Sequence, residues 1–253
     1  MKQASVGFHC PECAGAGKQQ VFKGTPSFDP VVTKVLLGIN VLAFLWSTVQ
    51  SGNLSSLGSE TLLDFGLFGG EGILVNGMQI GVSQGELYRI VTSGFLHDGF
   101  IHLGFNMYAL WILGPQLERV LDRQRFVALY FVGLLGGATG VMLLNPDSFT
   151  VGASGAIFGL FGAVAVIQRA SGANIWASGI GQVLAINLLF TFLVPRISVG
   201  GHLGGLLAGV AVGAIYIGMV RARQNAWVAT AAAAGLGGVL LAAIVFLAAN
   251  PIV

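Results

Sequence analysis

The sequence is poor in charged residues and in cysteine. Only 9% of its 253 residues are charged and 55% are hydrophobic, whereas soluble domains carry about 25% charged residues. Two cysteines, Cys10 and Cys13, exclude a disulfide framework. A net charge of +2 gives no sign of a nucleic-acid partner, and residues 1–30 lack the apolar core of a signal peptide. The composition therefore predicts a chain whose surface mostly faces a lipid bilayer.

Seven apolar windows approach the roughly 20 residues that a membrane-spanning helix needs. They cover residues 31–49, 100–117, 126–144, 154–168, 177–194, 202–220 and 228–249. The 39 glycines suit close packing of helices in lipid. No internal repeat is evident, which argues against a transporter built from inverted repeats.

These windows predict an all-α fold, a polytopic membrane helix bundle. We expect a cytosolic tail at residues 1–30, a six-helix core at 31–220 and a seventh transmembrane helix within 221–253. The connection 50–91 is too glycine-rich and interrupted to span. Its stretches 62–68 and 73–80 are expected to lie at the membrane interface or to pack on the bundle.

The basic residues predict the orientation, because they gather in cytoplasmic loops. With a cytosolic N-terminus, ten of the twelve lie inside: Lys2, Lys18, Lys23, Lys34, Arg119, Arg123, Arg125, Arg169, Arg221 and Arg223. Only Arg89 and Arg196 lie outside. We therefore expect a multi-pass protein of the cell membrane whose C-terminus is external.

A serine and a histidine interrupt two of the apolar windows near their predicted external ends. Ser154 lies between Gly152 and Gly155, and His202 opens a later window. Serine alone would more often bond back to its helix, but an ionisable group in a transmembrane helix is a functional candidate. A facing serine and histidine form a nucleophile and its base. No carboxylate lies in either window, so the pattern indicates a dyad and not a triad.

Small residues and a third window support this interpretation. Glycines at helical spacing, Gly205, Gly209 and Gly213, would let the His202 segment approach the Ser154 segment closely. A third segment carries His97, His102 and Asn106, again near the external face. These three could cap the helix or reach to the membrane edge. Alternatively, His102 and Asn106, four residues apart on one helix face, could stabilise an oxyanion.

These motifs together resemble the rhomboid family of intramembrane serine proteases. The resemblance covers residues 86 to about 213 and rests on four motifs: Tyr88-Arg89, His97-x4-His102-x3-Asn106, Gly152-Ala153-Ser154-Gly155, and Gly201-His202 with Gly205 and Gly209. It implies six core helices, here with one added, and a partly embedded first loop. Its substrates would be transmembrane proteins in the lipid bilayer, and its chemistry would need no cofactor.

The resemblance also implies a role for each site residue. Ser154 would be the nucleophile and His202 the general base. His102, Asn106 and the backbone N–H of Ser154 would form the oxyanion hole, with His97 in a supporting position. Arg89 would be a structural arginine of the loop. Position 158 is often tyrosine in relatives, and Phe158 keeps the ring that could stack on the imidazole of His202.

The N-terminal sequence His9-Cys10-Pro11-Glu12-Cys13 resembles half of a zinc ribbon. A structural zinc site needs four ligands, and His9, Cys10 and Cys13 supply at most three. We expect a free, reduced cytosolic tail, and a partial or intermolecular metal site is the alternative.

Two other functions compete with proteolysis. A catalytically inactive rhomboid-like protein could bind membrane clients, although both Ser154 and His202 are present. A channel or transporter could use His102 and His202 as a polar path, although the chain has no repeat and no acid accompanies them.

Overall fold

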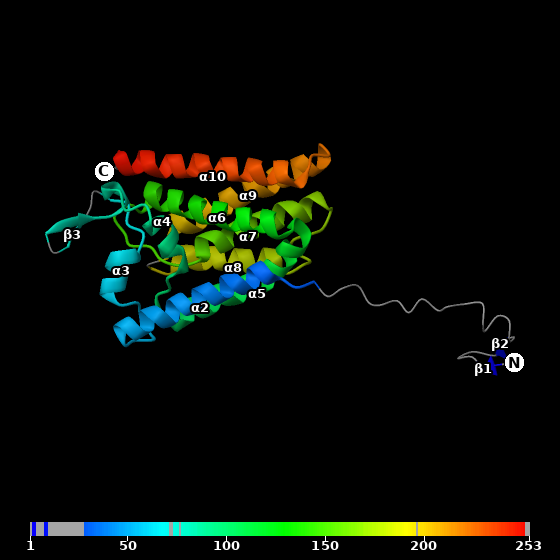
Figure 1. Ribbon diagram of the computed structural model, residues 1–253, viewed down its shortest axis with the longest axis horizontal. Coiled ribbons are helices and arrows are strands. Elements are labelled where there is room, and N and C mark those ends of the chain that lie inside the picture. The colour runs from blue at the N-terminus through cyan, green and yellow to red at the C-terminus, as the bar shows by residue number, and fades with distance from the viewer. Residues whose placement is uncertain are drawn as a thin grey trace.

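The computed structural model describes residues 2–3, 8–9, 28–70, 73–75, 77–195 and 197–250. Most of these residues are helical, and the long helices run alongside one another in a bundle (Figure 1). The long helices are α2 (Val31–Ser51), α5 (Gly99–Leu121), α6 (Arg123–Leu144), α7 (Ser154–Ala170), α8 (Ile180–Leu193), α9 (Val199–Arg221) and α10 (Ala226–Ala249). Each predicted window therefore contains a helix.

Four of these helices, α2, α6, α9 and α10, are long and apolar enough to cross a membrane. Helices α7 and α8 are apolar but shorter, with 17 and 14 residues. Helix α5 has 23 residues and carries His102, Asn106 and Glu118 within its apolar sequence. How many of the seven helices cross the bilayer stays a prediction.

The connection between α2 and α5 contains several short elements. These are α3 (Ser59–Phe65), β3 (Ile73–Val75), β4 (Met78–Ile80), η1 (Val82–Gln84), α4 (Arg89–Thr92) and η2 (Ser93–Phe95). Strands β3 and β4 form an antiparallel hairpin that projects from the bundle (Figure 1). The stretch 62–68 instead ends in two buried residues, Leu67 and Phe68.

A second short hairpin joins β1 (Lys2–Gln3) to β2 (Phe8–His9). Neither hairpin was predicted from the sequence, because two- and three-residue strands are too short for an alternating pattern to be recognised. The bundle itself is helical, as expected.

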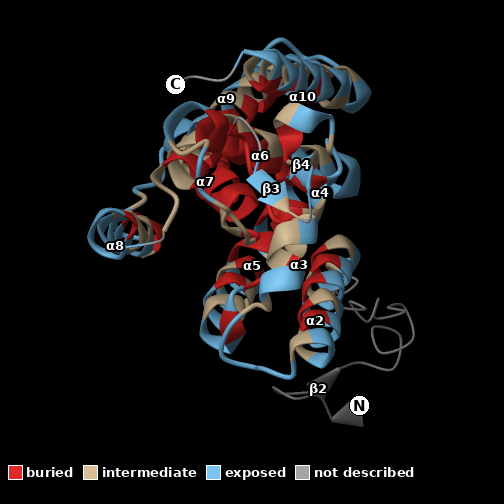
Figure 2. Ribbon diagram, turned by 90° about the vertical axis from the view of Figure 1, so that its left-hand side faces the viewer, coloured by how far each residue is buried: buried red, intermediate tan, exposed pale blue. Residues whose placement is uncertain are grey.

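The centre of the bundle is formed by α6, α7 and α9, where most buried residues lie (Figure 2). Helix α10 packs on the outside of α6, and α2 pairs with α5. Helix α8 lies apart from the central helices and contacts α7 and α9 only weakly (Figure 2). The first turns of α7 and α9, which carry Ser154 and His202, belong to this buried centre.

Helices α7 and α9 touch backbone to backbone through glycine. A Cβ atom added at Gly205 would collide with the carbonyl oxygen of Gly155, and one added at Gly209 would collide with that of Gly159. Gly213 continues the same face one turn further on, where an added Cβ would lie 3.1 Å from α7 backbone. The close approach predicted from these glycines is confirmed, and it explains why small residues recur at this spacing.

A buried carboxylate joins α2 to α5. Glu118 is fully buried, and its two oxygens accept hydrogen bonds from the backbone N–H groups of Val32 and Thr33, at 3.0 and 2.9 Å. The Thr33 hydroxyl donates to the same carboxylate at 2.8 Å. Because the first N–H groups of a helix have no partner within it, a carboxylate there both satisfies them and complements the helix dipole. Glu118 therefore fixes the start of α2 against α5.

Candidate active site

Ser154 is the first residue of α7. Gly152, two residues earlier, has no side chain and leaves the space beside the Ser154 hydroxyl open. Gly152 has φ of +126°, a conformation that favours glycine, and its N–H donates to the carbonyl of Ser93 at 2.9 Å. A Cβ at Gly152 would lie 2.8 Å from Nε2 of His102 and 3.7 Å from Oγ of Ser154. The imidazole edge of His102 and the hydroxyl of Ser154 thus face the same small volume, which only glycine leaves open.

His202 lies in the first turn of α9, beside the face of α7 that carries Ser154. The hydroxyl of Ser198 caps this helix by accepting the N–H of Gly201 at 3.0 Å. The imidazole of His202 stacks on the ring of Phe158, with centroids 4.0 Å apart and planes at 18°. Phe158 is one turn after Ser154, so both side chains project from the same face of α7.

Ser154 and His202 form no direct hydrogen bond among the contacts of the described residues, and their pairing stays a prediction. The Ser154 hydroxyl has no hydrogen-bond partner within that part of the chain. Hydrogen bonds between catalytic groups are often long in a free enzyme and shorten when the substrate binds. The unpartnered hydroxyl is therefore available to a substrate.

The hydrogen bonds of His102 determine which of its nitrogens carries the proton. The backbone N–H of Asp98 donates to Nδ1 of His102 at 3.3 Å. Since Nδ1 accepts, the neutral ring holds its proton on Nε2. That Nε2–H is the donor that lies next to Gly152 and Ser154.

Asn106 is buried one turn after His102 on α5. One N–H of its amide donates to the carbonyl of His102 at 2.9 Å. The second N–H has no acceptor among the described residues. The sequence placed His102 and Asn106 on one helix face, and the structure leaves each of them with one N–H group to donate.

His97 lies just before α5 and packs its ring against that of His102, with centroids 5.1 Å apart. Burial, assisted by the neighbouring His102, lowers the pKa of His97 to about 3. The ring of His97 is therefore neutral at pH 7. The two rings are in contact, and a supporting role for His97 stays a prediction.

Arg89 is buried in the loop before α5 and holds three parts of it together. Its guanidinium donates to Glu86 at 2.7 Å, to the carbonyl of Leu63 at 2.6 Å and to that of Gly66 at 3.0 Å. Burial alone would raise the pKa of the Glu86 carboxyl, but hydrogen bonds from Arg89 and the Gly81 N–H hold that pKa below its ordinary value. These contacts join parts of the loop, and the role of Arg89 stays a prediction.

One residue of the site was missed by the sequence analysis. Thr191 lies in the last turn of α8, is only 2% exposed, and places Oγ1 2.6 Å from Nδ1 of His202. The loop between α8 and α9 intervenes, so no helical spacing connects the two residues. The only signal in the sequence was a hydroxyl near the predicted external end of the apolar window 177–194.

The weak candidates for metal ligands fall largely outside the described residues. His9 lies in β2, and Cys10 and Cys13 lie beyond the described part of the chain. Within that part, no group of three or more histidine, cysteine, aspartate or glutamate residues could hold a metal ion.

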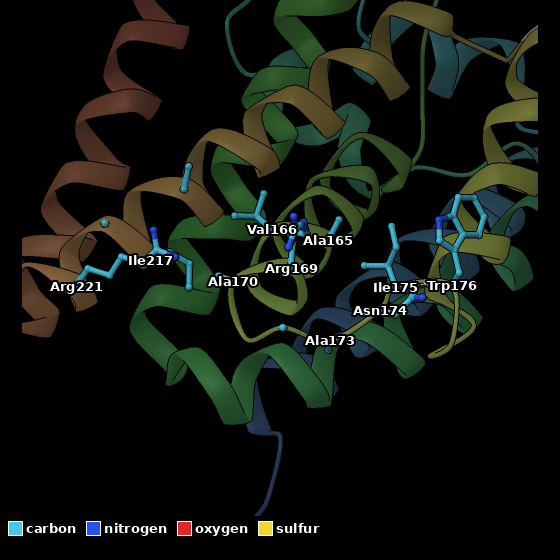
Figure 3. A pocket seen from close by; sticks show the side chains of 13 residues that line it. Ala165, Val166, Arg169, Ala170, Ala173, Asn174, Ile175, Trp176, Ile217 and Arg221 are labelled. Atoms are coloured by element: carbon cyan, nitrogen blue, oxygen red, sulfur yellow. Dashed lines mark hydrogen bonds between the residues drawn. The ribbon is translucent and has the colours of Figure 1, made fainter.

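A cavity of about 1030 Å³ lies at the other end of α7 and α9 (Figure 3). Its lining includes Arg169, Trp176 and Arg221 and none of the candidate site residues. Ser154 and His202 lie in the first turns of these helices, whereas Arg169 and Arg221 lie in their last turns. The cavity and the site are thus separated by the length of α7.

Comparison with known proteins identifies the family of the chain. Residues 84–219 match the family model of the rhomboid domain. The chain is 34% identical to the rhomboid protease GluP of Bacillus subtilis over 183 residues, which are 71% of this chain and 34% of GluP. It is 37% identical to the Bacillus subtilis protein YdcA over 139 residues, 53% of this chain and 70% of that protein. RHOMBOID-like protein 5 of Arabidopsis thaliana is 34% identical over 144 residues, 54% of this chain and 46% of the plant protein.

The helices thus define a multi-pass helical membrane protein. The chain belongs to the rhomboid family, whose named relatives include proteases. It spans about a third of the length of GluP.

Proposed function

We propose that this protein is an intramembrane serine endopeptidase with Ser154 as nucleophile and His202 as general base. One observation carries the proposal. Ser154 and the Nε2 atom of His102 face the volume beside Gly152, while the ring of His202 stacks one turn away on Phe158. Because the chain belongs to the rhomboid family, we read this arrangement as a nucleophile, a base and a donor for the oxyanion.

The chemistry is acyl transfer. Oγ of Ser154 attacks the scissile carbonyl carbon while Nε2 of His202 accepts the hydroxyl proton. The negative charge that develops on the carbonyl oxygen is stabilised by Nε2–H of His102, the amide of Asn106 and the backbone N–H of Ser154. His202 then protonates the leaving amine, and water hydrolyses the acyl-enzyme through the same steps.

Ser154 is well placed for this role at the start of α7. The first N–H groups of a helix have no acceptor within it, and the helix dipole is positive at this end. Both features favour a developing anion over a neutral carbonyl, which is how a site accelerates a reaction.

The substrates proposed are other membrane proteins, cleaved within or beside a transmembrane helix. A helical substrate engages its carbonyls in hydrogen bonds, so the scissile stretch must unwind before Ser154 can attack. Small or helix-weakening residues are therefore expected at the cleavage site.

The proposed topology has seven spans, a cytosolic N-terminus and an external C-terminus in the cell membrane. Water would reach Ser154 and His202 from the external face. Reporter fusions to the full chain at residue 1 and after residue 253 test it, and we expect the first to report the cytosol and the second the external side. Both ends reporting the same compartment would contradict an odd number of spans.

A fluorophosphonate probe tests the nucleophile directly, because such probes react with activated serines and not with ordinary ones. We expect the purified full chain to be labelled and Ser154→Ala to remain unlabelled. Ser171→Ala, at the other end of α7, is the matched control and should label like the wild type. Equal labelling of Ser154→Ala and wild type would rule out Ser154 as the nucleophile.

A further inference from the structure

A hydrogen-bonded chain leads from the backbone of α8 to the imidazole of His202. Oγ1 of Thr191 lies 2.7 Å from the carbonyl oxygen of Asn187 and 2.6 Å from Nδ1 of His202. Thr191 is almost fully buried. Both contacts are short enough to be hydrogen bonds.

The proton positions in this chain follow from the chemistry of the groups. A hydroxyl has one proton to donate and two lone pairs with which to accept. The Asn187 carbonyl can only accept, so both contacts are hydrogen bonds at once only when the hydroxyl proton of Thr191 lies in the bond to that carbonyl. The contact with Nδ1 of His202 is then a hydrogen bond only if Nδ1 carries a proton. A neutral imidazole protonated on Nδ1 has its lone pair on Nε2.

We propose that Thr191 is a positioning residue, which holds His202 in the tautomer with Nδ1–H and leaves Nε2 free to accept a proton. This inference rests on the proposed function, in which His202 is the general base. In soluble triads an aspartate does this work by accepting the same Nδ1–H. Here a neutral hydroxyl accepts the Nδ1–H, which avoids the free-energy cost of placing a charged carboxylate inside the membrane.

The two histidines of the site then carry opposite tautomers. His102 accepts at Nδ1 from Asp98 and holds its proton on Nε2, whereas His202 donates from Nδ1 to Thr191. One ring is therefore prepared to donate to an oxyanion, and the other to accept the proton of a nucleophile. Phe158 stacks on the ring of His202 and fixes its plane, but a stacked ring cannot select the tautomer. The hydrogen bond to Thr191 does select it.

Three variants of the full chain, reconstituted in phospholipid vesicles with a model transmembrane substrate, test the proposal. Thr191→Val keeps the shape of the side chain and removes its hydroxyl, and Thr191→Ser keeps the hydroxyl. Thr230→Val is the matched control, because the Thr230 hydroxyl makes the same bond to the carbonyl four residues earlier, with no histidine beside it.

We expect Thr191→Val to lower kcat about ten- to a hundredfold with little change in KM, because it leaves a buried Nδ1–H without an acceptor. Thr191→Ser should recover most of that loss, and Thr230→Val should match the wild type. A value of kcat for Thr191→Val near that of the wild type, in a protein that still depends on Ser154, would overturn this inference and leave the proposed function intact.

Nitrogen-15 spectra of histidine-labelled protein in bilayers give a readout independent of turnover and of any folding defect in Thr191→Val. His202→Gln identifies the signals of His202. We expect the neutral ring of the wild type to show a protonated Nδ1 and an unprotonated Nε2. The reverse pattern would overturn the inference, and a wild-type protein with no Ser154-dependent labelling would overturn it together with the proposed function.

Discussion

Ser154→Ala is expected to abolish cleavage of a model transmembrane substrate, with kcat lower by roughly 10⁴- to 10⁶-fold, and His202→Ala is expected to do the same. The nucleophile and its base act as a unit, so the loss of either removes almost all nucleophilic catalysis. The measurement is single-turnover cleavage by purified protein in vesicles.

Ser171→Ala provides the control, since this serine lies at the far end of the same helix and its hydroxyl bonds only to the carbonyl of Gln168 among the described residues. Thermal unfolding of each variant should stay close to that of the wild type. Near wild-type turnover by a folded Ser154→Ala protein would contradict the proposed nucleophile and favour an inactive, client-binding relative.

Loss of an oxyanion donor is expected to have the second largest effect. Asn106→Ala and His102→Ala should each lower kcat by about 10²- to 10³-fold with a smaller change in KM, because the hydrogen bond matures only as charge develops on the carbonyl oxygen. Asn106→Asp should be no better, since a carboxylate repels the oxyanion.

Asn187→Ala is a matched control for Asn106→Ala. The Asn187 amide donates to the carbonyl four residues earlier at 2.8 Å, as the Asn106 amide does at 2.9 Å, but Asn187 is only half-buried and lies on α8. Steady-state kinetics of the variants separate the two competing functions. If Asn106→Ala and His102→Ala both kept near wild-type kcat, these residues would be structural, and a polar path through the bundle would gain support.

The sequence predicted the helices from their apolar composition and the candidate site residues from the few polar groups within them. Polar groups are rare in apolar helices, so Ser154 and His202 stood out against their surroundings. The glycines at helical spacing after His202 also predicted which faces of α7 and α9 meet.

The contacts of Thr191 and Glu118 could not be predicted in the same way. Threonine is common in apolar helices, where it usually bonds back to its own backbone. A glutamate near a helix end usually lies in solvent. Both residues acquire their roles only through neighbours that are distant in sequence, His202 for Thr191 and the start of α2 for Glu118.

The glycine contacts between α7 and α9 have a consequence for how this protein can evolve. The backbones of the two helices are in direct contact at Gly205 and Gly209. No side chain lies between them there, so no substitution by a smaller or larger residue can adjust the distance between the helices. A displacement of about 1 Å between reacting groups can cost about a hundredfold in rate. In relatives that keep the activity, substitutions should therefore concentrate on α2, α8 and α10. Almost no substitutions are expected where the backbones of α7 and α9 are in contact.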